Sequence, residues 1–444
     1  MAMFFDDIGL QVPTVLLPAP TVDLKKWAVV ACDQYTSEPA YWERVRKFAG
    51  SAPSTLNIIL PEICLESPRL AHLISGINKT MRRYVAEGVL REQRPGLVLV
   101  DRRTVHAKSR KGMIVALDLE KYDFRKGSQT LIRATEGTIL ERIPPRVKIR
   151  KNASLELPHI MVLIDDPKRT VIEPLFKKRP SKLYDTDLMQ GAGHVTGYLI
   201  DDAAAIDRVH KNLARLADRG RFAKKYGAPG RGVLLYAMGD GNHSLATAKT
   251  IWETLKSRAK DKKAVMRHPA RFALVELVNV HDAGLEFEPI HRVVFNTDTA
   301  AMLKAMGSFF GRRFSVRTVK GRKNALQAAR SCKGPCHCIP FSASKTFGVI
   351  SIAQPKLTLE VATLQSFLDQ YLASHKRAKI DYIHGDEVVE SLSAKPGAIG
   401  FYLPPMDKSD LFKTVILDGA LPRKTFSMGE ASEKRFYLEC RKIT

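Results

Sequence analysis

The sequence predicts a mixed α/β fold, because short apolar runs alternate with longer segments of helical periodicity. Residues 97–101 (LVLVD) and 113–119 (MIVALDL) are continuous apolar runs of strand length. Residues 69–88 place their apolar side chains on one helical face and end at Gly88, a typical helix stop. A chain of 444 residues can form two or three domains of about 150 residues each.

The same patterns assign elements to the rest of the chain. We expect strands at 27–32 and 232–238, two strands around an Asp-Pro turn within 158–175, and two more within 271–295. We expect helices at 201–220, from Ser244 to about residue 257, at 363–374 and at 408–417. A new helix–strand pattern begins after residue 295, so we predict one domain over residues 1–294 and a smaller α/β domain over residues 295–444.

The net charge of +25, from 71 basic and 46 acidic residues, is the compositional outlier. Such a field could attract nucleic acid or nucleotides. The basic residues are nevertheless spread along the whole chain, without the long basic block and interleaved aromatics of a single-strand binding channel. We therefore favour a solvated basic surface over a nucleic-acid partner. The composition gives no indication of the oligomeric state.

The sequence predicts a cytoplasmic protein without a membrane partner. No apolar run approaches the roughly 18 residues that span a bilayer, and the first ten residues, MAMFFDDIGL, do not resemble a secretion signal. Six cysteines scattered without a framework are typical of a reducing compartment. In SCKGPCHCIP, Cys332, Cys336, His337 and Cys338 suggest zinc, but the spacing lacks the usual C-x2-C pair, so surface thiols at a turn are favoured.

The segment LLYAMGDGNHSLATAK, residues 234–249, carries the strongest functional signal. An apolar strand ends at the turn Gly239–His243, and a helix begins directly after it. The N–H groups in the first turn of a helix have no partners within the helix, so they favour an anion, above all phosphate. Gly239 and Gly241 would let a ligand approach the backbone closely.

Asp240 is unexpected beside a phosphate, because a carboxylate repels it. Its position is explained if Mg²⁺ lies between the two, or if the acid takes a proton from an attacking hydroxyl. The alternative is structural, since Asp and Asn are common in turns and cap helices well. The segment is neither a Walker A loop nor a G-x-G-x-x-G fingerprint.

The segment MGDGNHSLATAK resembles the D-G-H-H-R-x-x-A-A signature of the family catalogued as domain of unknown function 1015. Other segments are similar to the family in the family's own order, and together they cover nearly the whole chain. These are ACDQYTSEPAYWERV, LNIILPEICL, LIRATEGTILERIPPRVKIRKNASLELPHIMVLIDD, VELVNVHDAGLEFEPIHRVV, IDYIHGDEVVESL and GALPRKTFSMGEASEKRFYLE.

The resemblance implies a ParB/sulfiredoxin-like core, enlarged by insertions, that holds nucleotide phosphates at a helix start. A sulfiredoxin needs a nucleophilic Cys where this chain has Asn242, which excludes that branch. ParB nucleotide switches have a pair of Arg residues where this chain has Asn242-His243. They also act together with a helix-turn-helix motif, and this sequence shows no convincing pattern for one. The free-serine kinases carry an acid before the Gly, and Asp240 fits this pattern.

The resemblance therefore implies an ATP- and Mg²⁺-dependent phosphotransferase acting on a small hydroxyl compound, with free L-serine as the leading candidate. Asp240 would be the base or a metal ligand, with Asp33 and Glu136 as candidates for a second carboxylate. The phosphate-binding candidates are Gly239, Gly241, Asn242, His243 and Ser244, and the substrate-binding candidates are Arg133, His291 and Arg292.

Each assignment has a structural alternative: a helix cap for Asp33, a loop ion pair for Glu136, a backbone hydrogen bond for His243 and one structural ion pair for Arg292. Lys249 is expected only to extend over the surface.

Two departures from the family pattern indicate a divergent subgroup. Ser244 stands where the family has Arg, which removes a forked phosphate donor, and the stretch from Arg133 to Thr138 lacks the family's His. The alternatives are a ParB-like nucleotide-binding regulator that contacts nucleic acid and a ligand-binding protein whose site has decayed. The tail that carries Lys424, Glu430 and Lys434 is a candidate lid over the site.

Overall fold

The computed structural model describes residues 3–178, 180–332 and 334–444. The chain forms two compact units, a first unit of Met1–Glu286 with Gly429–Thr444 and a second unit of Phe287–Met428. This division differs from the predicted boundary at 294/295 in two ways: residues 287–294 belong to the second unit, and the tail (Gly429–Thr444) belongs to the first. The mixed α/β class expected from the sequence is confirmed.

The first unit is built around a mixed sheet whose described strands run in the order β11-β12-β5-β6-β14-β10-β13-β8-β7, with β2 joining at β6 and β1 pairing with β2. The pairs β10–β14, β13–β8 and β8–β7 are parallel and the others are antiparallel. The strands of this unit are β1 Phe4–Phe5, β2 Leu10–Gln11, β3 Leu16–Pro18, β4 Leu90–Glu92, β5 Leu97–Arg103, β6 Arg110–Asp118, β7 Tyr122–Asp123, β8 Ile132–Arg133, β9 Leu155–Glu156, β10 Met161–Ile164, β11 Ser181–Asp187, β12 His194–Ile200, β13 Tyr236–Asp240, β14 Phe272–Asn279 and β23 Arg441–Lys442.

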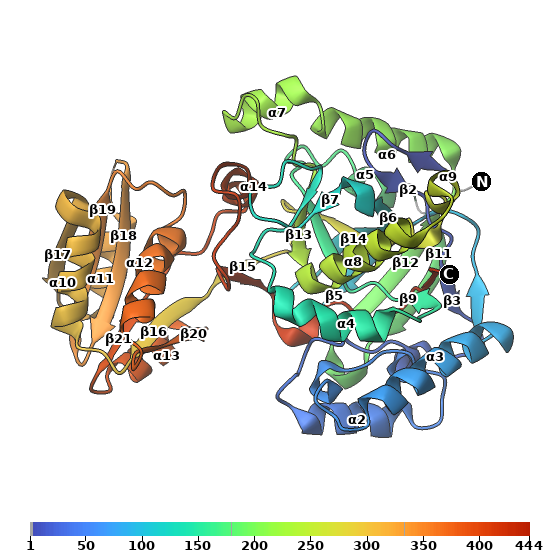
Figure 1. Ribbon diagram of the computed structural model, residues 1–444, viewed down its shortest axis with the longest axis horizontal. Coiled ribbons are helices and arrows are strands. Elements are labelled where there is room, and N and C mark those ends of the chain that lie inside the picture. Colours follow the sequence, from blue (N-terminus) through green and yellow to red (C-terminus); the bar gives the residue numbers. More distant parts are fainter. Residues whose placement is uncertain (1–2, 179, 333) are drawn as a thin grey trace. The chain divides into compact units, whose positions relative to one another are not determined.

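Helices cover both faces of this sheet. Successive side chains of β5 point to opposite faces: Leu97 and Leu99 enter one apolar cluster with α5, α6 and α8, and Val98 and Val100 enter another with α2 and α3. Figure 1 shows α6 and the pair α2 and α3 on opposite sides of the strands. The helices are α1 Leu24–Trp27, α2 Pro39–Ala49, α3 Leu70–Ala86, α4 Ile143–Arg150, α5 Glu173–Phe176, α6 Ala203–Leu216, α7 Arg219–Tyr226, α8 Asn242–Arg258 and α9 Lys262–Val265.

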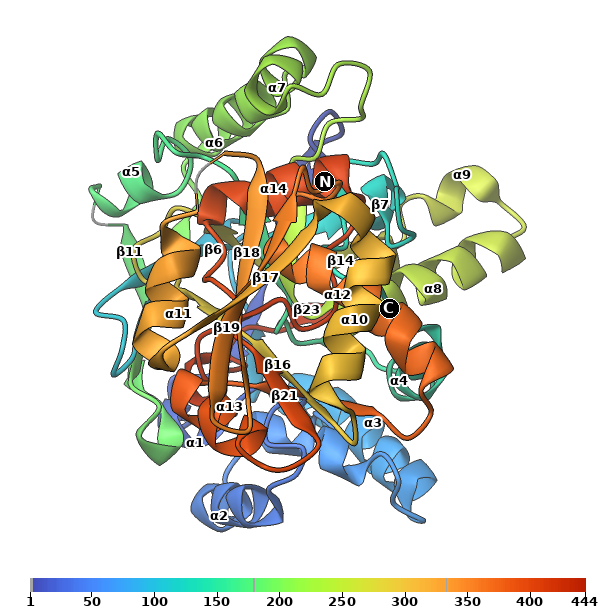
Figure 2. The same ribbon diagram turned by 90° about the vertical axis from the view of Figure 1, so that its left-hand side faces the viewer.

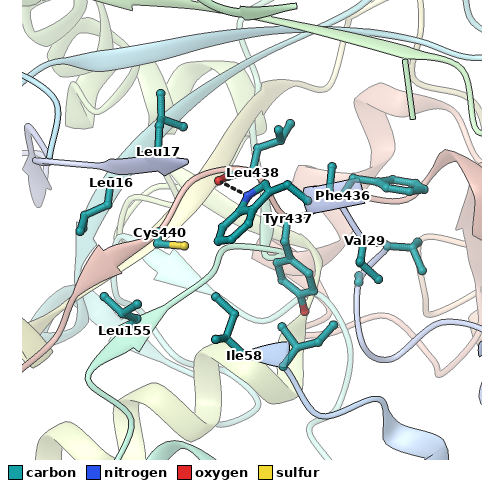
Figure 3. Close-up of a cluster of buried hydrophobic side chains, with 14 of the residues drawn as sticks. Leu16, Leu17, Val29, Ile58, Leu155, Phe436, Tyr437, Leu438 and Cys440 are labelled. Carbon is teal, nitrogen blue, oxygen red and sulfur yellow. Dashed lines mark hydrogen bonds between the residues drawn. The ribbon is translucent and has the colours of Figure 1, made fainter. Parts of the chain in front are cut away.

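The tail packs into the core of the first unit. Figure 3 shows Phe436, Tyr437, Leu438 and Cys440 among apolar side chains from distant parts of the chain, and all four are buried. The indole Nε1 of Trp27 donates to the carbonyl of Leu438 at 3.1 Å. Burying an apolar side chain of this size contributes about 1.5–3 kcal/mol, so the end of the tail is a core element and does not form the predicted lid.

The second unit contains an antiparallel sheet in the order β17-β19-β18-β21-β16-β20. In Figure 2, α11 and α13 lie on one side of these strands, and α10 and α12 lie on the other. Its elements are β15 Phe287–Pro289, β16 His291–Phe295, α10 Thr299–Phe310, β17 Phe314–Val319, α11 Gly321–Arg330, β18 Cys336–Ala343, β19 Thr346–Ala353, α12 Glu360–Ser374, β20 Lys379–Ile383, α13 Asp386–Ser393, β21 Ala398–Phe401, α14 Lys408–Leu417 and β22 Phe426–Met428.

The predicted strand at 27–32 is wrong. Asp23 accepts from the N–H groups of Lys25 and Lys26 and starts α1, and Val30 makes only an isolated bridge to Phe436. Within 158–175 the first strand is β10, but the second is the short helix α5, which has Pro174 in its first turn.

The predicted helix at 201–220 is two helices. The first ends at Leu216, and the side chain of Asp218 accepts from Arg221 N–H and starts α7. Gly220 therefore lies inside a helix and does not stop one. The expected strands at 97–101 and 113–119 and the expected helices at 69–88, 363–374 and 408–417 are confirmed as β5, β6, α3, α12 and α14.

Candidate functional site

The connection between β13 and α8 is shorter than the predicted five-residue turn. Strand β13 extends through Asp240, the helix begins at Asn242, and Gly241 alone joins them with φ +79°. A Cβ on Gly241 would lie 3.0 Å from the Cα of Ile160. Both the left-handed backbone and this close approach require glycine here.

The start of α8 is open to a ligand. No side chain caps it, and its first internal bond runs from Leu245 N–H to the carbonyl of Gly241 at 3.0 Å. Within the described residues the backbone N–H groups of Asn242, His243 and Ser244 have no hydrogen-bond acceptor. Such groups at the positive end of a 17-residue helix favour an anion.

A cavity of about 160 Å³ lies at this helix start, and we call it the site cavity. It brings together side chains from the segment before α2, a short 3-10 helix (Glu62–Cys64), the loop after β8, helix α4 and the β13–α8 connection. Its lining residues are Asp33, Glu62, Glu136, Gly137, Arg146, Asp240, Gly241, Asn242, His243 and Ser244. The three carboxylates named from the sequence therefore lie around one cavity with the helix start, and Gly239 does not line it.

Asp240 is held ionised by a lysine of the tail. Lys434 Nζ lies 3.1 Å from Asp240 Oδ2, and Gly241 N–H donates to Oδ1 at 2.8 Å. Burial alone would raise the pKa of Asp240, but the Lys434 charge and hydrogen bond, the field of His159 and the Gly241 N–H together lower it. The carboxylate is therefore an anion at neutral pH, with 30% of its side chain exposed.

His243 is a neutral imidazole at neutral pH. Burial, with the charges of Arg146 and Arg142, lowers its pKa to about 4, and the opposing effect of Asp33 is smaller. The backbone N–H of Ile139 donates to Nε2 at 3.4 Å. The backbone hydrogen bond considered as the alternative for His243 is therefore present, and in this tautomer Nδ1 carries the proton.

A hydrogen-bonded chain that the sequence did not indicate leads away from Ser244. Its Oγ lies 2.8 Å from His159 Nε2, His159 Nδ1 lies 2.7 Å from the Tyr437 hydroxyl, and Cys32 N–H donates to that hydroxyl at 3.1 Å. The chain ties the start of α8 to the tail and to the segment that carries Asp33. These four residues are far apart in sequence, so the periodicity of the sequence could not predict the hydrogen bonds between them.

Arg146 is a further residue that the sequence assignments missed. It lies on α4, forms an ion pair with Glu62 and donates through Nη1 to the carbonyl of Arg142 at 2.8 Å. It lines the site cavity. The available signal was its position in LIRATEGTILERIPPRVKIRKNASLELPHIMVLIDD, one of the segments that resemble the family.

A second cavity of about 140 Å³ adjoins the first, and we call it the apolar cavity. The two share Glu62, Arg146 and Ser244 among their lining residues. Most of the other lining side chains are aliphatic; those from the described helices and the 56–65 segment are Ile58, Ile59, Leu60, Leu65, Ile77, Met81 and Ile149. A polar chamber and an apolar chamber therefore meet at the Glu62–Arg146 ion pair.

Of the three substrate-binding candidates, Arg133 lies in the first unit but does not line the site cavity. Arg133 is buried and donates to the carbonyls of Thr130 and Gly232, which fastens the loop before β13. His291 and Arg292 lie on β16 of the second unit, whereas the site-cavity residues belong to the first.

Within the second unit, His291 Nε2 lies 3.0 Å from an Asp386 carboxylate oxygen, and the side chain of Arg292 is fully buried. Arg292 donates to the carbonyls of Ile290, Arg423 and Lys424. Its Nε also donates to the side-chain oxygen Oε1 of Gln365 at 3.3 Å. The single ion pair considered as the alternative for Arg292 stays a prediction.

The other predicted features have local structural roles. Lys249 donates to the carbonyl of Leu119 at 2.9 Å and forms an ion pair with Glu253, so it connects α8 to the segment that follows β6. Glu430 forms a capping box with Glu433 at the start of a short 3-10 helix in the tail. Lys424 belongs to the second unit.

The model of the family described as protein of unknown function (DUF1015) matches residues 16–402 of this chain. No curated protein matches the chain.

Among the described residues, no helix combines the length and apolar character needed to cross a bilayer.

Solved structures give weaker likenesses. A free serine kinase variant in complex with AMP has 9% identity and a TM-score of 0.39, over 74% of this chain and 92% of that one. A conserved hypothetical protein from Pyrococcus furiosus has 10% identity and a TM-score of 0.36, over 73% and 94%. SbnI with a C-terminal truncation from Staphylococcus aureus has 9% identity and a TM-score of 0.32, over 73% and 82%. TM-scores below 0.5 do not establish a common fold, so these likenesses carry no functional argument.

Proposed function

This chain belongs to the DUF1015 family, and from that premise we propose that it transfers the γ-phosphoryl group of ATP to a small hydroxyl compound. L-serine is the leading acceptor, as the sequence resemblance implies. The observation that carries the proposal is the site cavity itself, where an uncapped helix start, a guanidinium and several carboxylates meet. Phosphoryl transfer needs groups that bind the phosphates, a cation that offsets their charge, and a carboxylate base that accepts the hydroxyl proton.

The start of α8 would bind the phosphates. The N–H groups of Asn242, His243 and Ser244 supply donors without a charge of their own, and Gly241 allows close approach. Arg146 supplies a forked, permanently charged donor in the same cavity. We infer that Arg146 takes over the phosphate contact that was lost when Ser244 replaced the family's Arg.

The carboxylates would divide the remaining work. Asp240, ionised beside Lys434, is suited to hold a cation, and Asp33 and Glu136 are the candidates to take the acceptor's hydroxyl proton. Mg²⁺ is usually bound by one or two carboxylates together with phosphate oxygens and water, so Asp240 with one further carboxylate of the cavity would be enough. When bound, Mg²⁺ would neutralise phosphate charge. The chain's own part is to orient the acceptor hydroxyl and accept its proton at a carboxylate oxygen.

The apolar cavity would accommodate the base of the nucleotide, because it adjoins the phosphate-binding region and has aliphatic walls. Ile149 of α4 lines it and is only partly buried, so it can be enlarged without a change in the deep core. We expect Ile149→Trp to raise the KM for ATP about tenfold with little change in kcat, because it removes ground-state binding. Ile149→Leu is the matched control, and an unchanged KM in the Trp variant would place the base elsewhere.

Phosphorus NMR on the purified chain with Mg²⁺, ATP and L-serine tests the activity directly. We expect a phosphoserine signal from the wild type and a rate at least about a hundredfold lower from Asp240→Asn. Asp33→Asn and Glu136→Gln assayed in parallel identify the base, which should show the larger loss in kcat. Absence of phosphoserine rejects serine, and absence of turnover with any hydroxyl acceptor rejects the phosphotransferase.

The two alternatives remain distinguishable in the same preparation. Nucleotide binding without turnover would favour a decayed site. Nucleotide-dependent DNA binding that weakens steeply with salt would favour the regulator, which the charge of +25 supports.

A further inference from the structure

Three cysteines of the second unit form a sulfur cluster that the proposed function does not use. Cys332 follows α11, and Cys336 and Cys338 lie on β18. The Sγ atoms of all three lie within 4.8 Å of one another. Cys332 and Cys338 are joined as a disulfide, and Cys336 Sγ is 3.8 Å from Cys338 Sγ. The sequence predicted surface thiols at a turn, and this prediction is wrong, because two of the three form a disulfide and Cys336 and Cys338 lie on a strand.

The strand places the three sulfur atoms on one face. Cys336 and Cys338 are two residues apart, so their side chains point to the same side of β18, where α11 packs. His337 points to the opposite side, and its Nδ1 lies 2.9 Å from Thr363 Oγ1 of α12. Among the described residues this cluster has three sulfur ligands and no His, Asp or Glu.

We propose that Cys332, Cys336 and Cys338 bind one Cu(I) ion when reduced, and that the Cys332–Cys338 disulfide closes the site when oxidised. Thiolates select soft cations such as Cu(I). At a metal–sulfur distance of about 2.3 Å, three sulfur atoms around one ion lie roughly 4 Å apart, close to the 3.8 Å between Cys336 and Cys338. A structural zinc site would require a fourth protein ligand.

The redox step balances with a dithiol reductant. The Cys332–Cys338 bond breaks, and each sulfur gains one electron and one proton. The dithiol supplies these two electrons and two protons and forms a disulfide of its own. Cu(I) binding then displaces thiol protons, because the thiolate is the ligand. All three cysteines are partly buried, so the rim of the cluster is open to solvent exchange.

The test uses the full chain, reduced with a dithiol and then freed of it under anaerobic conditions. Cu(I) is offered as a coloured complex with a competing chelator, and copper transfer to the protein is followed by the loss of colour. We expect one equivalent to transfer to the wild type and at least about tenfold weaker binding in Cys336→Ser. Cys64→Ser, a free thiol of the first unit, is the matched control and should bind as the wild type does.

The oxidised wild type provides a second comparison that needs no substitution. It should take up no copper until the dithiol restores the thiols. The proposal is overturned if the reduced wild type does not compete, if the oxidised protein binds equally, or if the Cys336→Ser and Cys64→Ser variants behave alike. Preference for Zn²⁺ over Cu(I) in the same competition would also overturn it.

Discussion

Two groups of charged side chains in the first unit differ in how deeply they are buried and in how many charged partners they have. At the buried network around Arg435, Nη1 lies 2.6 Å from Glu276 Oε2, Nη2 pairs with Glu439, and Nε donates to the carbonyl of Pro158. Their side chains are at most 4% exposed. In the site cavity, Asp240 has one lysine partner and is 30% exposed. Buried charges that are paired with each other stabilise the fold, whereas a partly exposed charge can exchange its partner for a ligand.

The largest expected effect comes from breaking the buried network. Arg435→Met leaves Glu276 and Glu439 charged and buried without their partner, which costs about 3–5 kcal/mol of unfolding free energy. Urea denaturation followed by circular dichroism measures this loss. The control is Lys211→Met, which removes an exposed pair with Asp207 and should cost less than about 0.5 kcal/mol. Equal losses in the two variants would contradict the distinction between the two groups.

Gly241→Ala should have an intermediate effect. The left-handed backbone costs a non-glycine residue about 1–2 kcal/mol, and the new methyl group must also displace Ile160. Gly227 shares the left-handed conformation at the end of α7 but has open space around it. Thermal or urea unfolding should therefore show Gly241→Ala to be less stable than Gly227→Ala by about 1 kcal/mol. If the costs are equal, the close approach of Ile160 has no energetic weight.

The last expected effect is absent at neutral pH and appears only on acidification, and it is due to His243. Its pKa falls from the usual 6.5 to about 4 in the folded chain, so between these values the unfolded state binds a proton that the folded state does not. Acidification through this window therefore destabilises the wild type. His243→Gln lacks this contribution, so the stability difference between wild type and variant should shift in the variant's favour from pH 7 to pH 4. A difference independent of pH would show that the imidazole titrates normally.

The sequence was sufficient for features that depend on local pattern. The alternating runs located β5 and β6, and the glycine, acid and helix start between β13 and α8 identified Asp240 and Gly241. The order of family segments was sufficient to name Asp33 and Glu136, which line the same cavity. Their roles remain predictions.

The sequence was not sufficient where contacts between distant segments determine the position of a side chain. Arg133 and Arg292 matched a motif, but each donates to backbone carbonyls of its own unit. Arg146, His159 and Lys434 reach the site only because α4, the segment before β10 and the tail pack against one another, which no single segment reveals. The run at 27–32 has strand composition, but a helix cap at Asp23 starts a helix just before it.

The packing of the tail into the core has a consequence for biosynthesis. The first unit is discontinuous in sequence, and its core includes Phe436, Leu438 and Cys440 from the segment that follows the second unit. A ribosome synthesises these residues only after residues 287–428, so the second unit emerges before the core of the first unit can be completed. Lys434 and Tyr437 are also made after the second unit, so the partner of Asp240 is supplied later than the other residues of the site cavity. A chain terminated before residue 429 would lack both this core segment and the lysine of the ion pair.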